Sequence, residues 1–477
     1  MSEQKIIFGT DGWRGLLDSE VTIKNVAAVA QAFSDYLLAR IHKIISPQVA
    51  VAYDGRTNSK VFATIFARVL AGNNIRAFLS DTIVPTPVLS YYIKHHSLDA
   101  GVMITASHNP AVYNGIKFKA AYGGPFFTED TREVEKLIGS SLVQTSDSFH
   151  TVDFLHSYIK HVEGIIDFET IRDSSLSVLI DSMSGAGGTL LQRMLEEYQI
   201  PCKTIYGVPR EDFDGRNAEP IEKNLVPLKD ELQNQPGFAL GVATDGDADR
   251  LGVLLENGDW LSAQETILLL TDYIVNKRNF HGAIVKTSSV TDKIRRFESP
   301  RRKVIDVQVG FKYICEAMIN ETVAIGCEES GGYGFKGHIP ERDGILSALY
   351  MMEMIANSGC KSLSEYANQK REEFGIIHYN RIDLPTHANN RLEILPLLAQ
   401  GSTLKIAGFS ITGKQEFLSS RGIINGLKLV LEGTSRWILF RASETEPLFR
   451  IYAEAESATE VESLLQSGED IIKRLSI

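Results

Sequence analysis

Short, continuous apolar runs recur along the chain, separated by longer stretches with the spacing of an amphipathic helix. Runs of this length favour strands that are buried on both faces. The clearest of them are at residues 48–53, 100–104, 177–181, 238–243 and 323–327. Stretches of helical periodicity, such as residues 22–43 and 345–356, lie between such runs. Strands that alternate with helices predict an α/β fold with a mainly parallel or mixed sheet.

The last part of the chain has a different pattern. Beyond residue 374, strand-like segments follow one another without long helices between them, and a helix is predicted to end near residue 475. The predicted strands are residues 404–411, 427–431, 437–440 and 448–455. A chain of 477 residues suits roughly three domains of about 150 residues, or four smaller ones. We predict four domains, at residues 1–156, 157–261, 262–373 and 374–477.

One loop combines a nucleophile with two candidate proton carriers. The apolar run at residues 100–104 ends in Thr105-Ala106-Ser107-His108-Asn109-Pro110, and Asn-Pro is a strong turn signal. A serine at such a position can be exposed yet rigidly held. His108 is adjacent to it, and Lys117 follows at the end of the segment. For this loop taken alone, a serine that only caps a turn stays open as the alternative.

A second loop carries three carboxylates at strict alternation. Asp245, Asp247 and Asp249 lie between two apolar runs, in a loop that contains glycine. Like charges this close repel one another, so the loop favours a hard divalent cation with oxygen ligands, and few protein ligands favour Mg²⁺. A solvated acidic turn is the alternative. An EF-hand is excluded because its sixth position requires glycine and Arg250 stands there, between strands instead of helices.

Weaker ligand signals occur in other loops. The glycines of residues 8–15, after a strand predicted at residues 5–8, allow backbone N–H groups to approach an anion, and Arg14 offers a planar fork to phosphate. Residues 182–188 form a glycine-rich turn without the lysine of a nucleotide-binding loop. Glu328 and Ser330 suit sugar hydroxyls, and Arg441, Ser443 and Thr445 suit phosphate. For each of these loops an ordinary turn stays open.

The composition of the chain indicates which kinds of partner and which cellular compartment to expect. The 49 Lys and Arg against 60 Asp and Glu give a net charge of −11, which argues against nucleic acid or an anionic membrane as the main partner. The four cysteines are scattered, as expected of free thiols in a reducing compartment. Neither a signal peptide nor a run of transmembrane length is seen. We therefore expect a cytoplasmic protein, either a monomer or a homodimer.

Taken together, four motifs resemble the α-D-phosphohexomutase superfamily, in its order and spacing and over essentially the whole chain. They are Thr105–Pro110 with Asn114-Gly115-Ile116-Lys117, Asp245–Arg250, Glu328-Glu329-Ser330-Gly331 and Arg441–Pro447. The resemblance implies three similar mixed α/β domains and a smaller α+β C-terminal domain around a central cleft. It also implies an enzyme that isomerises a hexose monophosphate.

The resemblance implies a role for each matched residue. Ser107 would carry the phosphoryl group, and Mg²⁺ would be bound by an oxygen of phosphorylated Ser107 with Asp245, Asp247 and Asp249. The transferring group would be surrounded by Arg14, His108, Lys117 and Arg250, with Lys117 or His108 handling protons. Sugar hydroxyls would be held by Glu328 and Ser330, and the non-reacting phosphate by Arg441, Ser443 and Thr445. Further substrate-binding candidates are Lys286 and Lys312.

The motif Cys327-Glu328-Glu329-Ser330-Gly331-Gly332 looks most like the phosphoglucomutase branch, with glucose 1,6-bisphosphate as intermediate and activator. Phosphomannomutase, dual phosphoglucomutase/phosphomannomutase and phosphoglucosamine mutase stay open as alternatives. Two positions depart from the branch: Arg342, where a lysine is usual, and Glu444, where a smaller residue is usual. Two other classes also stay open, namely a Mg²⁺-dependent sugar-phosphate phosphatase and a non-catalytic sugar-phosphate-binding protein.

Overall fold

The computed structural model describes residues 6–9, 11–40, 46–385, 391–401, 405–419, 422–442 and 448–475. The chain forms two compact units, which are described separately. Unit 1 comprises Met1–Ala263, Met318–Asn320 and Ser330–Asn368. Unit 2 comprises Gln264–Ala317, Glu321–Glu329 and Gln369–Ile477. Mixed α/β sheets precede an antiparallel C-terminal sheet, which confirms the predicted fold class.

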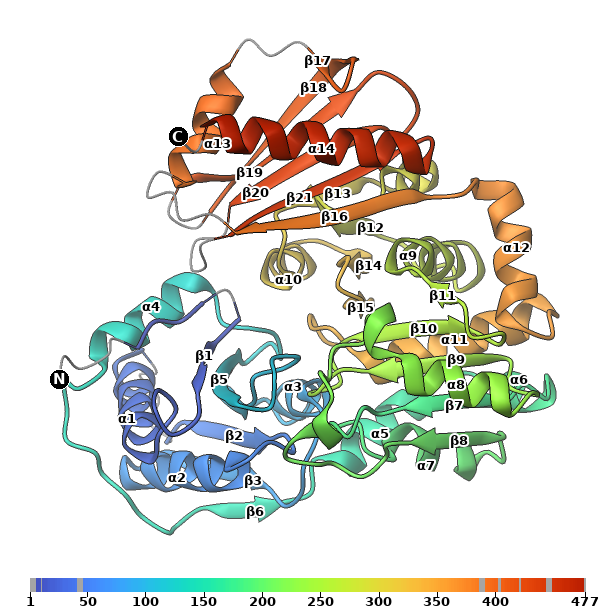
Figure 1. The fold of residues 1–477 in the computed structure, drawn as a ribbon. Helices are drawn as coiled ribbons and strands as arrows, with labels where there is room; N and C mark the ends of the chain where they lie inside the picture. Colours follow the sequence, from blue (N-terminus) through green and yellow to red (C-terminus); the bar gives the residue numbers. More distant parts are fainter. Residues whose placement is uncertain are drawn as a thin grey trace. The chain divides into compact units, whose positions relative to one another are not determined.

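The first sheet of unit 1 has the order β1-β5-β4-β2-β3-β6 (Figure 1, blue to teal). Its strands are β1 (Trp13–Leu16), β2 (Gln48–Tyr53), β3 (Arg76–Ser80), β4 (Ala100–Ile104), β5 (Tyr113–Ala120) and β6 (His150–Val152). Strands β4, β2, β3 and β6 run parallel, whereas β5 and β1 are antiparallel additions. The helices of this part are α1 (Ile23–Arg40), α2 (Ser59–Gly72), α3 (Thr86–His95) and α4 (Thr128–Leu137). Phe33 of α1 and Phe66 of α2 pack against Phe118 of β5 in one core.

The second sheet of unit 1 has the order β11-β10-β9-β7-β8. Its strands are β7 (Val178–Asp181), β8 (Cys202–Ile205), β9 (Leu240–Thr244), β10 (Leu251–Leu255) and β11 (Trp260–Leu261). Four helices precede or connect them: α5 (Leu155–Glu163), α6 (Phe168–Asp173), α7 (Leu190–Glu197) and α8 (Val226–Asn234). Later residues return to this unit as β15 (Tyr333–Phe335), α11 (Gly344–Ser358) and the start of α12 (Leu363–Phe374).

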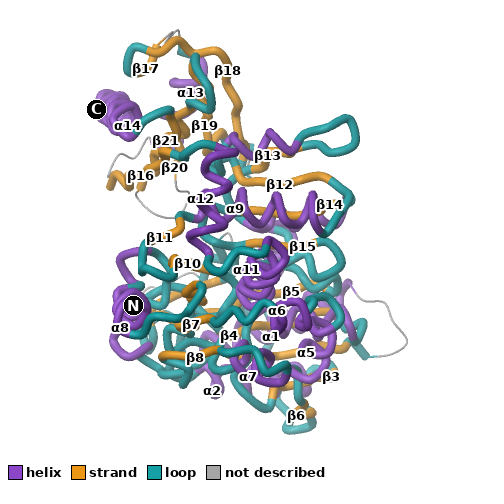
Figure 2. Tube along the Cα trace, turned by 90° about the vertical axis from the view of Figure 1, so that its right-hand side faces the viewer, coloured by secondary structure: helices purple, strands orange, loops and turns teal. Residues whose placement is uncertain are grey.

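Unit 2 begins with a parallel arrangement of β13 (Val304–Val307), β12 (Ala283–Thr287) and β14 (Val323–Cys327), with helices α9 (Ala263–Asp272) and α10 (Phe311–Asn320). An antiparallel sheet follows, in the order β16-β21-β20-β19-β18-β17. Its strands are β16 (His378–Pro385), β17 (Lys405–Ile406), β18 (Phe409–Leu418), β19 (Ile424–Leu431), β20 (Trp437–Ala442) and β21 (Leu448–Ala455). Helices α13 (Arg391–Gln400) and α14 (Ala458–Leu475) cover one face of this sheet (Figure 2).

Two sequence predictions about strands are wrong. Residues 6–8 are not a strand, and the first strand is β1, which begins at Trp13. The single strand predicted at residues 404–411 is two strands, β17 and β18, joined by a tight turn. Ala407 and Gly408 of this turn have φ of 49° and 89°, a pair of positive values that folds the chain back on itself. Hydrophobicity alone did not reveal the turn because the sequence stays apolar through it.

In the part of the chain that the structure describes, no helix is both long enough and apolar enough to cross a bilayer.

Candidate active site

Ser107 lies in the loop that joins the end of β4 to β5. Its backbone adopts the left-handed conformation, with φ of 54°, and its N–H donates to Thr105 Oγ1 at 2.8 Å. The Ser107 hydroxyl lies 3.2 Å from Asp245 Oδ2 and 3.4 Å from His108 Nδ1. Ser107 is fully buried, although a serine in such a loop can be exposed. The cause is the loop after β9, which packs against Ser107.

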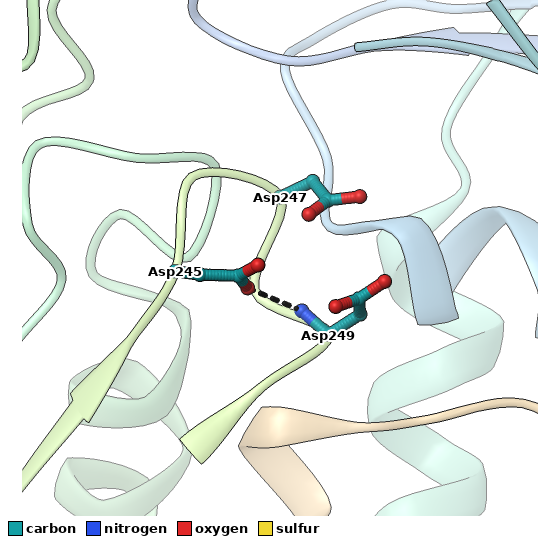
Figure 3. A group of neighbouring side chains, drawn as sticks. All are labelled: Asp245, Asp247 and Asp249. Carbon is teal, nitrogen blue, oxygen red and sulfur yellow. Dashed lines mark hydrogen bonds between the residues drawn. The ribbon is translucent and has the colours of Figure 1, made fainter. Parts of the chain in front are cut away.

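That loop brings the three predicted carboxylates together (Figure 3). One oxygen from each of Asp245, Asp247 and Asp249 lies within 4.8 Å of the others, and all three residues are buried. Asp245 Oδ1 accepts the backbone N–H groups of Asp249 at 2.9 Å and Arg250 at 3.1 Å, which closes the loop on itself. Ala248, with φ of 55°, supplies the reversal that this closure needs.

Backbone contacts support this loop from two directions. The glycine-rich loop at residues 182–188 packs beneath it, where the Ala186 N–H donates to Gly246 O at 2.9 Å. A Cβ on Gly185 would lie 2.9 Å from the same oxygen, so only glycine fits there. From the later segment of unit 1, the Gly344 N–H donates to Ala248 O at 3.1 Å. The sequence left the role of residues 182–188 open, and in the structure they buttress the aspartate loop.

Lys117, on β5, neutralises most of this negative charge. Its Nζ lies 2.8 Å from Asp247 Oδ2, 3.2 Å from Asp249 Oδ2 and 3.2 Å from Asp11 Oδ2. Burial opposes the charged form of the amine, but the three carboxylates outweigh burial and raise the pKa of Lys117. Lys117 is therefore a fixed positive charge beside the triad.

Three residues make contacts in the candidate site that the sequence did not predict. Arg342 reaches the triad through Nη2, which lies 2.7 Å from Asp249 Oδ2 and 2.9 Å from Asp11 Oδ2. Thr86, the first residue of α3, donates its hydroxyl to Asp247 Oδ2 at 2.6 Å. Asp11 lies in the glycine-rich loop at residues 8–15 and contacts both Lys117 and Arg342. The sequence predicted that this loop binds an anion, and it gave Asp11 no role. For Arg342, the one signal in the sequence was that an arginine stands where the phosphoglucomutase branch usually has a lysine.

The three aspartates differ in how strongly their charges are compensated. Burial, and then the neighbouring charges of Asp249 and Asp247, raise the pKa of Asp245. For Asp247, burial is outweighed by Lys117, which lowers the pKa of this carboxyl well below its ordinary value. Among the described residues, none donates a hydrogen bond to the buried oxygens Asp247 Oδ1 and Asp249 Oδ1. The loop therefore holds acceptor oxygens that a cation can use.

The remaining predicted residues of unit 1 lie in or near the serine loop, beside the aspartates, or directly after unit 1 is rejoined at Ser330. Arg14, on β1, donates from Nη1 to Asn109 Oδ1 at 2.8 Å. Arg250 Nε lies 3.9 Å from both Asp245 Oδ2 and Asp249 Oδ1. Burial, and then the charges of Arg250 and Arg14, lower the pKa of His108 well below its ordinary value. Ser330 belongs to unit 1 as well, directly before Gly331, whose carbonyl accepts the Leu251 N–H at 2.9 Å.

The other predicted substrate-binding residues belong to unit 2. Glu328 follows β14 and is buried, Lys312 lies in the first turn of α10, and Arg441 lies near the end of β20. Lys286 is fully buried, and its Nζ already meets Val290 O at 3.0 Å, Asp292 Oδ1 at 2.9 Å and Asp306 Oδ1 at 2.5 Å. Ser443, Glu444 and Thr445 lie outside the described residues.

Known proteins resemble this chain over nearly its whole length. Three family models match it: Phosphoglucomutase/phosphomannomutase alpha/beta/alpha domain I at residues 5–143, domain II at 156–258 and domain III at 262–374. A "Probable phosphoglucosamine mutase" of Methanobrevibacter smithii is 30% identical, over 98% of this chain and 99% of its own. The "Phosphoglucomutase/phosphomannomutase" of Thermococcus kodakarensis is 29% identical, over 97% of both chains.

A solved structure agrees with these sequence relatives. A Thermus thermophilus protein assigned as a phosphomannomutase superposes with a TM-score of 0.84 at 33% identity, over 98% of this chain and 99% of that chain. With such similarity, the protein is a phosphohexomutase, an enzyme that moves a phosphoryl group within a hexose phosphate. It belongs to the phosphoglucomutase/phosphomannomutase family of the α-D-phosphohexomutase superfamily, as its motifs predicted.

Proposed function

We propose that this enzyme interconverts glucose 1-phosphate and glucose 6-phosphate, with Ser107 as the phosphoryl carrier and Mg²⁺ bound by the aspartate loop. The observation that carries the proposal is the position of the Ser107 hydroxyl, 3.2 Å from Asp245 Oδ2 at the edge of the carboxylate triad. A phosphoryl group on this oxygen would therefore lie beside the metal ligands and the cationic side chains.

The donor set fits Mg²⁺. Asp245, Asp247 and Asp249 supply hard carboxylate oxygens close enough to share one ion, and two of those oxygens lack a hydrogen-bond donor among the described residues. An oxygen of phosphorylated Ser107 would complete the protein's contribution. When bound, Mg²⁺ would neutralise negative charge on the phosphoryl oxygens, which is the main requirement of phosphoryl transfer.

The chemistry has two transfers. In the first, the bond between phosphorus and Ser107 Oγ breaks, and a bond forms between phosphorus and the free hydroxyl oxygen of the sugar monophosphate. The hydroxyl proton leaves to a base, and glucose 1,6-bisphosphate results. In the second, the other phosphoryl group moves to Ser107 Oγ, and a proton returns to the sugar oxygen that it leaves. No water is consumed, and phosphate has moved between C1 and C6.

The surrounding residues divide these tasks by position. His108 is proposed to handle the proton because its Nδ1 lies 3.4 Å from Ser107 Oγ, whereas Lys117 contacts carboxylates. Lys117, Arg14 and Arg250 are proposed to stabilise the charge that spreads over the phosphoryl oxygens. Glu328 and Ser330 are proposed for the sugar, and Arg441 with Ser443 and Thr445 for the non-reacting phosphate. Lys286 is less well suited, since its buried ammonium group already lies within 3.0 Å of the carbonyl of Val290 and the carboxylates of Asp292 and Asp306.

Glucose is favoured by the motif Cys327-Glu328-Glu329-Ser330, which looks like the phosphoglucomutase branch. The relatives near 30% identity carry names for different sugars, among them phosphoglucosamine mutase and phosphoglucomutase/phosphomannomutase. Mannose and glucosamine phosphates are accordingly the competing substrates. A Mg²⁺-dependent phosphatase would use the same serine and metal but would release inorganic phosphate.

The test is an assay of purified wild type and Ser107→Ala with glucose 1-phosphate, mannose 1-phosphate and glucosamine 1-phosphate. Mg²⁺ and trace glucose 1,6-bisphosphate are present, and free phosphate is followed. We expect the highest kcat/KM for glucose 1-phosphate, no phosphate release and no sustained turnover by Ser107→Ala. A preference for another sugar would overturn the glucose assignment. Steady phosphate release, or near-normal turnover by Ser107→Ala, would overturn the mechanism.

A further inference from the structure

The buried guanidinium of Arg56 holds the serine loop from beneath. We propose that Arg56 is a positioning residue that fixes Ser107 for phosphoryl transfer; this inference rests on the proposed role of Ser107 as the phosphoryl carrier. Arg56 follows β2 in the loop Asp54-Gly55-Arg56, and only 2% of its surface is exposed. Its hydrogen bonds within the described residues go neither to the aspartate triad nor to a residue proposed to bind the sugar.

Arg56 donates to four backbone carbonyls of one irregular segment. Nη2 donates to Ser107 O and Asn109 O, both at 2.6 Å. Nη1 donates to Pro110 O and Tyr113 O, both at 2.9 Å. The fifth N–H, on Nε, donates to Asp54 Oδ2 at 3.1 Å. All five guanidinium hydrogens are therefore used, and four of them hold residues 107–113.

This pattern explains how an irregular loop keeps one conformation. Carbonyls that are withdrawn from water need a donor, and the carbonyls of Ser107 and Asn109 receive theirs from Arg56. Ser107 also adopts a φ of 54°, which costs free energy in any residue other than glycine and persists only when neighbours enforce it. A planar fork with five donors can bridge four carbonyls, whereas a lysine ammonium has three hydrogens at a single point.

Arg56 also links the serine loop to the aspartate loop. Its guanidinium lies over the ring of Phe213, with 4.7 Å to the centroid. A Cβ on Gly246 would collide with Ser107 O and would lie 3.2 Å from Phe213 Cζ. Ser107 O is thus held by Arg56 and packed against the glycine between two proposed metal ligands. Arg56 thereby sets the separation between Ser107 Oγ and the triad.

Arg56→Lys tests the proposal, because it keeps the charge beside Asp54 and removes the fork. We expect kcat to fall by about 100-fold, the effect of a misplacement of about 1 Å. KM for glucose 1-phosphate should stay within about threefold, since the hydrogen bonds of Arg56 are all to protein atoms. Phosphorylation of Ser107 by glucose 1,6-bisphosphate, followed by intact mass, should slow in parallel. Backbone amides of residues 105–113 should exchange hydrogen faster.

Arg216→Lys is the matched control. Arg216 also forms a fork with a buried aspartate, Asp181, at 3.2 and 2.7 Å, donates to the carbonyl of Asn224 at 2.9 Å and lies over the ring of Tyr206. None of these contacts involves the serine loop. We expect Arg216→Lys to lower Tm about as much as Arg56→Lys while leaving kcat within about threefold of wild type.

The outcomes separate this proposal from the one on which it rests. If wild type shows no phosphoryl group on Ser107, the proposed mechanism fails. The positioning role is overturned if wild type is phosphorylated and kcat of Arg56→Lys stays within threefold of wild type. It is also overturned if kcat falls no further in Arg56→Lys than in Arg216→Lys. Arg56→Gln, which keeps two N–H donors without charge, serves as the second variant. Failure of both Arg56 variants to fold would mark Arg56 as a residue needed for folding and would also overturn the proposal.

Discussion

A largely buried cluster of opposite charges in unit 1 behaves differently from a second such cluster in unit 2. The serine-site cluster of unit 1 consists of Asp11, Lys117, Asp245, Asp247, Asp249 and Arg342. The unit-2 cluster consists of Lys286, Asp292, Asp306, Lys428 and Glu454. In the unit-2 cluster, Asp292 Oδ1 lies between Lys286 Nζ at 2.9 Å and Lys428 Nζ at 3.0 Å. Glu454 accepts from the Thr291 hydroxyl at 2.8 Å and from Trp437 Nε1 at 3.2 Å.

The difference appears in the pKa of matched carboxyls. Burial raises the pKa of both Asp245 and Asp292, but Lys286 and Lys428 reverse the effect at Asp292 and lower its pKa. At Asp245, the nearby carboxylates add to burial, and its pKa stays raised. Buried charge alone therefore does not indicate a reactive centre. What distinguishes the serine-site cluster is that carboxylates gather around Asp245 without enough positive charge to lower its pKa, which leaves room for a cation.

The largest expected effect comes from Asp245→Asn. We expect kcat to fall at least about 100-fold, because a proposed ligand of the Mg²⁺ that would serve phosphoryl transfer is lost. Tm of the metal-free protein should not fall, because the substitution relieves like-charge repulsion between the aspartates. The side-chain oxygen of asparagine can still accept the backbone N–H groups of Asp249 and Arg250. Assays over a range of Mg²⁺ concentrations measure kcat, and thermal unfolding in the presence of a chelator measures Tm of the metal-free protein. Asp181→Asn, at a buried carboxylate outside the loop, is the control and should leave the Mg²⁺ dependence intact. Lower stability of Asp245→Asn without metal would contradict the comparison.

Asp292→Asn should show the reverse pattern. Two buried ammonium groups would lose their shared carboxylate, and we expect a loss of about 3 kcal/mol in the free energy of unfolding. Urea unfolding measures this loss. The Mg²⁺ concentration at half-maximal activity should stay at the wild-type value, because the unit-2 cluster contributes no proposed metal ligand. A change in Mg²⁺ dependence without a loss of stability would remove the distinction between the clusters.

The smallest effect concerns pH. Burial raises the pKa of Glu454 to about 7, in surroundings that include Thr291, Asp292, Lys428 and Lys286. Its folded pKa lies above the unfolded value, so the native state binds more protons between about pH 4.5 and 7. The stability from this group is present below that window and is lost as pH rises through it. We expect Tm to fall by about 3 °C more in wild type than in Glu454→Gln between pH 5 and 7. Glu416→Gln, at an exposed position on the same sheet, should keep the wild-type slope.

The pattern of apolar residues along the chain predicted the buried strands and the loops that follow them, because both depend on neighbouring residues. Strands β2, β4, β9 and β14 lie where apolar runs placed them, and the loops that follow β4 and β9 carry the predicted serine and aspartates. Arg56, Thr86 and Asp11 were missed because their contacts join segments far apart in the chain. The four predicted domain boundaries stay a prediction.

Arg342 belongs to a segment that returns to unit 1 after part of unit 2 has been built. During synthesis the aspartate loop therefore emerges long before the guanidinium that contacts Asp249 and Asp11, and before Gly344, which supports Ala248. At typical ribosomal speeds the delay is roughly 5–20 seconds. A nascent chain that ends before residue 342 thus carries Ser107, the proposed nucleophile, and the three carboxylates without the guanidinium of Arg342. The order of synthesis delays completion of the site until most of the polypeptide exists.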